Sequence, residues 1–158
     1  MAKRVFGSAY VVKTVTLTLD TAQYGSGDLL AAPQEITGLC SQQRGAILHS
    51  LTVLDKDDQG GSMEFLFTGD SISMGTENAA YAIAQANAYA IQARVPVASG
   101  DFTDYGSFRY AQYGPTATGM GGVLRPTSGT SLWLGAISRD TKTHSAAGIV
   151  VNVGFLLP

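Results

Sequence analysis

The chain has 158 residues, a formal charge of −2 at pH 7 and only 14% charged residues, against roughly 25% in ordinary soluble proteins. That length fits one domain, and a hydrophobic content of 45% is enough to bury a core. The slightly acidic balance gives no electrostatic reason to expect a nucleic-acid-binding protein. A surface with so few charges instead suits a protein whose faces lie against other protein, because interface cores are depleted in charge.

Cysteine content and apolar runs limit the environment of the protein. The single cysteine, Cys40, excludes an internal disulfide and a cysteine-rich zinc site, and it is predicted to be a small buried residue. The basic start at Lys3 and Arg4 is not followed by the apolar run of a secretion signal. The longest apolar stretch, 146–157, is far shorter than the roughly 20 residues of a membrane span. We therefore expect a soluble protein that is made in the cytosol.

The chain begins with an arm and a strand. Residues 1–9 show no periodicity, which predicts an extended N-terminal arm ahead of a β-sandwich domain over 10–158. From Val11 to Leu19, apolar residues alternate with Thr and other residues, and this β-branched alternation predicts the first strand. After a turn-rich connection, short strands are predicted at 29–32, stopped by Pro33, and at 35–39.

The stretch from Ala46 to Phe67 is predicted to be one long hairpin around which the chain is organised. Apolar and polar residues alternate at period two over 47–54 and again over 63–68, so each strand has one set of side chains on each face. The linker over 55–61 is rich in Asp and Gly, which favour turns. We expect an antiparallel pair whose apolar face is covered by a second sheet.

The second half is predicted to consist mostly of strands. The alanine-rich segment after Thr76 has helix propensity, so one or two helical turns are expected near 77–85 and a strand at 89–98. An aromatic loop or irregular strand is expected at 101–113. About eight strands with almost no helix predict an all-β protein, a single antiparallel β-sandwich or jelly roll with one short helical segment. The remaining strands are predicted at 119–125, 131–139 and 149–157.

The strand over 132–137 is apolar on both faces, with Leu132, Leu134 and Ala136 on one face and Trp133 and Ile137 on the other. In a two-layer sandwich only one face of each sheet meets the core. The second apolar face therefore requires a covering loop or a neighbouring subunit. The sequence leaves both possibilities open.

Catalytic motifs are not found in the chain. His49 and His144 lie far apart, and there is no nucleophile elbow, phosphate-binding glycine loop or zinc-protease helix. His49 alternates in phase with Ile47 and Leu51, which indicates a residue of the core or of a sheet edge. We predict that the protein is not an enzyme.

One segment begins like a calcium-binding loop. Asp55 and Asp57 occupy the first and third positions of the calcium-loop pattern, and Gly60 the sixth, but the twelfth is Leu66 where a bidentate Glu belongs. Asp55, Asp57 and Asp58 are therefore interpreted as turn formers. We predict that the protein needs no metal and no cofactor.

Several pieces of the chain, taken together, resemble a known family. In order and spacing over about residues 10–157, they resemble the small β-sandwich virion proteins of tailed bacteriophages, of the head-decoration or cement type. The pieces are Tyr24-Gly25-Ser26-Gly27-Asp28, Leu51 to Asp55 with Met63-Glu64-Phe65-Leu66-Phe67, Asn78-Ala79-Ala80-Tyr81, Leu132-Trp133-Leu134 with Arg139-Asp140, and Val151 to Leu157.

The resemblance implies a capsid decoration protein that binds the capsid lattice and stabilises the head. Its partners would be the major capsid protein and two further copies of itself in a homotrimer, with no nucleic acid and no membrane. It would be located on the capsid surface of the virion. The interface residues predicted for this role are Lys3, Arg4, Val5, Phe6, Phe102, Tyr105, Phe108, Trp133 and Ile137.

A second function stays open. The aromatic residues of 102–113 can pack in an interface, or they can stack on sugar rings as in a receptor- or glycan-binding module of a phage head fibre or tail. A glycan hydrolase is disfavoured, because no closely spaced carboxylate pair can be assigned.

Overall fold

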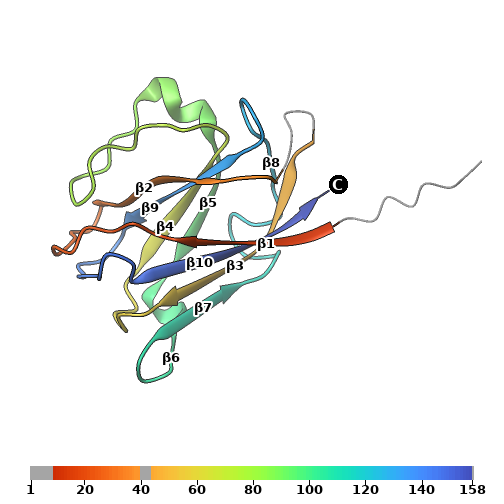
Figure 1. Cartoon of the computed structure of the whole chain (residues 1–158). Coiled ribbons are helices and arrows are strands. Elements are labelled where there is room, and N and C mark those ends of the chain that lie inside the picture. Colours follow the sequence, from red (N-terminus) through yellow and green to blue (C-terminus); the bar gives the residue numbers. More distant parts are fainter. Residues whose placement is uncertain (1–8, 40–43, 158) are drawn as a thin grey trace, which may run out of the picture.

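The computed structural model describes residues 9–39 and 44–157, and it consists of two antiparallel β-sheets packed face to face (Figure 1). One sheet has the strand order β1-β10-β3-β7-β6, with β8 also paired to β3, and the other has the order β2-β9-β4-β5. The predicted all-β sandwich is confirmed. The strands are Ala9–Thr16 (β1), Leu29–Ile36 (β2), Ala46–Asp55 (β3), Met63–Thr68 (β4), Ile91–Val97 (β5), Thr103–Asp104 (β6), Arg109–Tyr113 (β7), Val123–Leu124 (β8), Leu132–Ser138 (β9) and Ile149–Leu157 (β10).

The path of the chain between the sheets is that of a jelly roll. Among the long strands, β1, β3, β7 and β10 lie in one sheet and β2, β4, β5 and β9 in the other. Every connection between consecutive long strands therefore crosses the sandwich, except the one from β4 to β5. In this arrangement each layer contains four long strands, and the two central strands of each layer are not consecutive in the chain.

The hairpin predicted over 46–67 is wrong in its pairing. β3 pairs with β10, β7 and β8, whereas β4 pairs with β5 and β9, so the two strands lie in different sheets. The loop over 56–62 carries the chain across the sandwich. Period-two alternation specifies the two faces of a strand but not its partner. The burial of every residue of β4 fits a central strand of a sheet covered on both sides.

Three other predictions need correction or fall outside the described residues. The strands expected on either side of Pro33 form one strand, β2, whose register shifts there. Because β2 is an edge strand, the missing amide hydrogen of Pro33 costs no ladder bond. The helical turns expected near 77–85 are not formed, and a 3₁₀ helix runs instead over Gln85–Ala90. Cys40 and residues 1–8 lie outside the described residues.

The core lies between the sheets and is built from their alternating inward residues. Phe65 and Phe67 of β4 belong to one buried cluster with Phe155 of β10 and Leu51 of β3, and all four have essentially no exposed surface. Burying one such side chain contributes about 1.5–3 kcal/mol relative to leaving it exposed. These contacts hold the two layers in register.

A second apolar cluster covers the other face of the four-stranded sheet. Ile137 and Leu66 point away from the main core and pack against Ile72 and Met74, which come from the segment between β4 and β5. Figure 1 shows this segment lying outside the sheet. A Cβ atom at Gly135 would meet the sulfur of Met74. The chain itself therefore covers Ile137 on the second apolar face of β9, one of the two possibilities that the sequence leaves open, whereas Trp133 on the same face is only partly buried.

Removing the Met74 side chain tests this cover. Met74 is 1% exposed, and Met74→Ala is expected to lower the free energy of unfolding by about 2–5 kcal/mol through lost burial and a cavity. Urea denaturation measures the change. Tyr89→Ala is the control, because Tyr89 belongs to the same segment but is 68% exposed; its effect should stay within about 0.5 kcal/mol. A loss for Met74→Ala as small as the one expected for Tyr89→Ala would mean that Met74 does not stabilise the sheet.

Candidate functional site

The outward-facing side of the six-stranded sheet, called here the outer face, carries no charged residue in its paired rows. Residues paired directly across antiparallel strands share a face of the sheet. The row of Val15, Val151, Val53 and Ala111 is buried against the core, so the rows that alternate with it point outward. These outward rows are Thr16, Val150, Leu54, Tyr110 and Thr103; then Thr14, Asn152, Thr52 and Gln112; then Val12, Gly154 and Ser50; and finally Tyr10, Leu156, Ile47 and Val123.

Apolar surface is exposed on the outer face. Tyr10, Val12 and Val123 are each about half exposed, at 54%, 50% and 53%. The surrounding side chains are hydroxyls and amides, which form neutral hydrogen bonds such as the one from Thr14 Oγ1 to Asn152 Oδ1 at 2.7 Å. Losing water from such a surface costs much less than desolvating charged groups. The outer face therefore has the composition of a protein contact surface.

A groove of about 450 Å³ lies on the outer face, between β1 and the chain that follows β7. The Tyr10 hydroxyl lies 2.8 Å from Ser50 Oγ, and the Tyr10 ring meets the His49 ring edge-on at 5.5 Å between centroids. Gly154 lies beneath, where a Cβ atom would collide with both Tyr10 and Ser50. The absence of a side chain at 154 thus lets Tyr10 fold over β10 to form one wall of the groove.

The residues predicted for an interface are not brought together. Phe102 is 9% exposed in the main core and Ile137 is 1% exposed under the covering segment, so neither offers surface to a partner. Trp133 is partly buried on the opposite sheet. Tyr105 is 60% exposed and stacks on Phe108 at the tip of the β6–β7 hairpin, with 5.1 Å between ring centroids. The predicted residues Lys3, Arg4, Val5 and Phe6 lie outside the described residues.

Sequence reasoning missed the outer face because strand pairing assembles it. Its rows join β1 to β10, β3 and β7, which are distant in the chain. A partial signal was present in the first strand. Tyr10, Val12, Thr14 and Thr16 form one uncharged set, while Lys13 belongs to the other.

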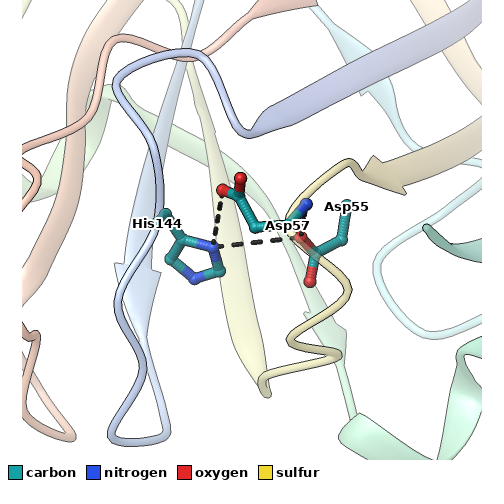
Figure 2. A group of neighbouring side chains, drawn as sticks. All are labelled: Asp55, Asp57 and His144. Carbon is teal, nitrogen blue, oxygen red and sulfur yellow. Dashed lines mark hydrogen bonds and ion pairs between the residues drawn. The ribbon is translucent and has the colours of Figure 1, made fainter. Parts of the chain in front are cut away.

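A partly buried acidic cluster at one end of the sandwich joins two loops. Asp55 ends β3, Asp57 lies in the β3–β4 loop, and His144 comes from the β9–β10 loop (Figure 2). His144 Nδ1 lies 4.0 Å from Asp55 Oδ1 and 3.8 Å from Asp57 Oδ2. One donor atom from each of the three side chains lies within 4.8 Å of the others, so these residues could hold a metal ion.

The interpretation of the aspartates as turn formers is confirmed for Asp55. Its carboxylate accepts the amide hydrogens of Asp57, Gln59 and Gly60, at 3.0, 3.0 and 2.7 Å. Asp58 occupies the left-handed backbone region at φ 56°, which Asp tolerates better than most residues. The crossing loop is thus wound around one carboxylate.

Asp58 is turned away from the cluster, so the calcium-loop pattern is not realised. Its carboxylate accepts a hydrogen bond from Arg109 Nε at 2.9 Å, and the same guanidinium binds Asp104 at 3.0 Å. Leu66, at the twelfth position of the pattern, lies buried in β4. The oxygen ligands that a calcium loop needs are therefore not gathered.

The pKa of His144 is lowered although two carboxylates lie beside its ring. Burial lowers the pKa of His144 and is the largest influence on it, opposed by the negative charges of Asp55 and Asp57. Asp57 is fixed by Ser145, whose amide donates to Asp57 Oδ2 at 2.7 Å and whose hydroxyl donates to Oδ1 at 2.8 Å. A neutral imidazole beside oriented carboxylates is a donor set that metals accept.

Replacing Asp55 tests the anchoring of the crossing loop. Asp55→Ala leaves three amide hydrogens without their acceptor in a site that is 0% exposed, so we expect a loss of at least about 3 kcal/mol of unfolding free energy. Asp58→Ala is the matched control, since its ion pair with Arg109 is partly exposed and should contribute at most about 1 kcal/mol. Thermal and urea unfolding measure both. A loss for Asp55→Ala no larger than that for Asp58→Ala would contradict the assignment.

Comparisons with known proteins place the chain in no family. No protein-family model matches it, and no curated protein matches its sequence. Among solved structures it is similar to a chain titled Desmodium yellow mottle tymovirus, with 9% sequence identity and a TM-score of 0.31, covering 99% of this chain and 91% of that chain. A TM-score this low carries no argument about function. In the described residues, no helix is long and apolar enough to cross a membrane.

Proposed function

We propose that this protein is a structural component of a virion, a capsid decoration protein that binds the major capsid protein through the outer face. The observation that carries the proposal is the set of uncharged rows across β1, β10, β3 and β7, with Tyr10, Val12 and Val123 half exposed. Jelly rolls occur in viral capsid and lectin domains. That is an analogy of fold, and the argument for function comes from the surface.

The outer face suits many weak contacts repeated over a lattice. Each Å² of apolar surface buried contributes roughly 25 cal/mol before the costs of association are subtracted. Hydroxyl and amide groups fix the register of a contact without the large penalty of burying charges. Copies held on a symmetric shell gain further from effective concentration. Modest affinity at each lattice point is then enough to stabilise a head.

Placing a charge on the outer face tests this binding mode. Val12→Glu puts a carboxylate in the proposed contact, where it would be desolvated without a partner, so we expect binding to capsids stripped of the protein to weaken by roughly tenfold or more. Occupancy measured by titration of such capsids checks this. Ser128→Glu is the control, because Ser128 is exposed in the turn between β8 and β9. Equal occupancy of the two variants, both with unchanged melting temperatures, would rule out the outer face.

Copy number on the particle separates decoration from other virion roles. Quantitative mass spectrometry and imaging of intact particles should give a number of chains that matches the capsid lattice points. A few copies at one vertex would instead indicate a head fibre or tail component. Absence of the protein from purified particles would overturn the virion role altogether.

A receptor- or glycan-binding module is the second candidate, and the exposed Tyr105–Phe108 stack favours it. A planar aromatic surface of this kind can take the apolar face of a sugar ring. A glycan array with the wild-type chain and Tyr105→Ala distinguishes the two functions. Binding that is lost in the variant supports the module, and no binding leaves decoration as the better proposal.

Two observations led to the proposed homotrimer: the doubly apolar strand over 132–137 and the low charge of the chain. The first is weakened, because the covering segment and not a neighbouring subunit buries Ile137. The low charge of the chain remains. Light scattering of the free protein, or imaging on the particle, is expected to show three chains together.

Deleting residues 2–8 of the proposed arm should leave folding intact and weaken attachment to the shell.

A further inference from the structure

The Nδ1 atom of His144 makes no hydrogen bond in the acidic cluster. It is 3% exposed, and its Nδ1 atom has no hydrogen-bond partner. The two carboxylate oxygens that Nδ1 faces are 3.8 and 4.0 Å away, beyond the 2.7–3.2 Å of an N–H···O bond. If Nδ1 carries no hydrogen, its lone pair points at two anions instead. Nδ1 is therefore unsatisfied in either tautomer, which is unusual for a buried polar atom.

These separations fit an ion lying between the three side chains. Transition metals bind imidazole nitrogen and carboxylate oxygen at about 2.0–2.2 Å, so two ligands of one tetrahedral ion lie about 3.3–3.6 Å apart. Shifts of a few tenths of an ångström would bring the 3.8 and 4.0 Å separations to that length. Figure 2 shows the imidazole nitrogen directed at both carboxylates. Asp57, at 23% side-chain exposure, leaves an entry path from solvent.

We propose that Asp55, Asp57 and His144 bind one divalent transition-metal ion, with Zn²⁺ the best match, which fastens the β3–β4 loop to the β9–β10 loop. Two carboxylates and a neutral imidazole compensate the charge of a divalent ion and leave a fourth position for water. Imidazole favours Zn²⁺ over Ca²⁺ and Mg²⁺, which prefer sites made of oxygen. This departs from the expectation of a metal-free protein drawn from the sequence.

Hydrogen bonds to neighbouring residues already orient the two carboxylates that would bind the metal. Asp55 is fixed by three backbone amides and Asp57 by Ser145. The amide of Lys56 donates to the carbonyl of Gly148 at 2.8 Å, which ties the two loops together beside the cluster. A Cβ atom at Gly148 would collide with the Asp57 carboxylate. Such outer contacts raise metal affinity, because they set ligand direction before the ion arrives.

The test is a metal titration of the untagged protein after dialysis against a chelator. Zn²⁺ is expected to bind at one ion per chain and, at about a hundred times its dissociation constant, to raise the melting temperature by roughly 5–10 °C. Ca²⁺ and Mg²⁺ at the same concentration should leave it unchanged. Long-range ¹H–¹⁵N spectra should show a shift of His144 Nδ1 and none of His49. No bound zinc, or bound zinc that leaves the His144 resonances in place, would overturn the proposal.

Two variants and a matched control locate the site. His144→Gln and Asp57→Asn are each expected to weaken zinc binding at least tenfold, since each loses one of three ligands. His49→Gln is the control: His49 Nδ1 is also buried without a partner, but its ring packs against Tyr10. It should bind zinc as the wild type does. If His49→Gln loses as much affinity as His144→Gln, the zinc is not held at this cluster.

Discussion

The crossing from one sheet to the other depends on the Asp55 carboxylate. At the end of β3 the chain must leave its sheet, traverse the edge of the sandwich and enter β4 in the opposite layer, and this exposes amides that no strand can pair. Asp55 accepts three of them while lying fully buried. A buried charge is costly unless it is hydrogen-bonded, and here the amides supply those bonds. The same carboxylate stands beside Asp57 and His144, so the structural anchor and the proposed metal site share one residue.

The outer surfaces of the two sheets differ, because one is covered by another segment of the chain and the other is exposed. The four-stranded sheet is covered by the segment between β4 and β5, whose Ile72 and Met74 replace solvent over Leu66 and Ile137. The six-stranded sheet has no such cover over its paired rows in the described part of the chain. Its outer face combines half-exposed Tyr10 and Val12 with neutral polar groups. Of the two sheet surfaces, this is the one that we propose meets a partner.

The proposed metal and the proposed contact surface are physically independent. The cluster lies where the β3–β4 and β9–β10 loops meet, and the contact surface lies on the strands. A metal that fastens two loops would act on the stability of the sandwich, through binding to the folded state alone. The contact surface would act on attachment to a shell. Each proposal can therefore fail without the other.

The sequence by itself determined the fold class and the positions of the strongest strands. Alternation predicted β9 and β10 nearly to their ends, because side-chain period is a local property. The sequence also identified Asp55 as a turn former, since an aspartate carboxylate can accept hydrogen bonds from backbone amides a few residues further along, here those of Asp57 and Gly60. Only the tertiary structure decided that β3 and β4 part into different sheets, that Ile137 is covered by its own chain, and that His144 meets Asp55 and Asp57. These are pairings between residues far apart in the chain, and the period of a strand carries no information about which strand lies beside it.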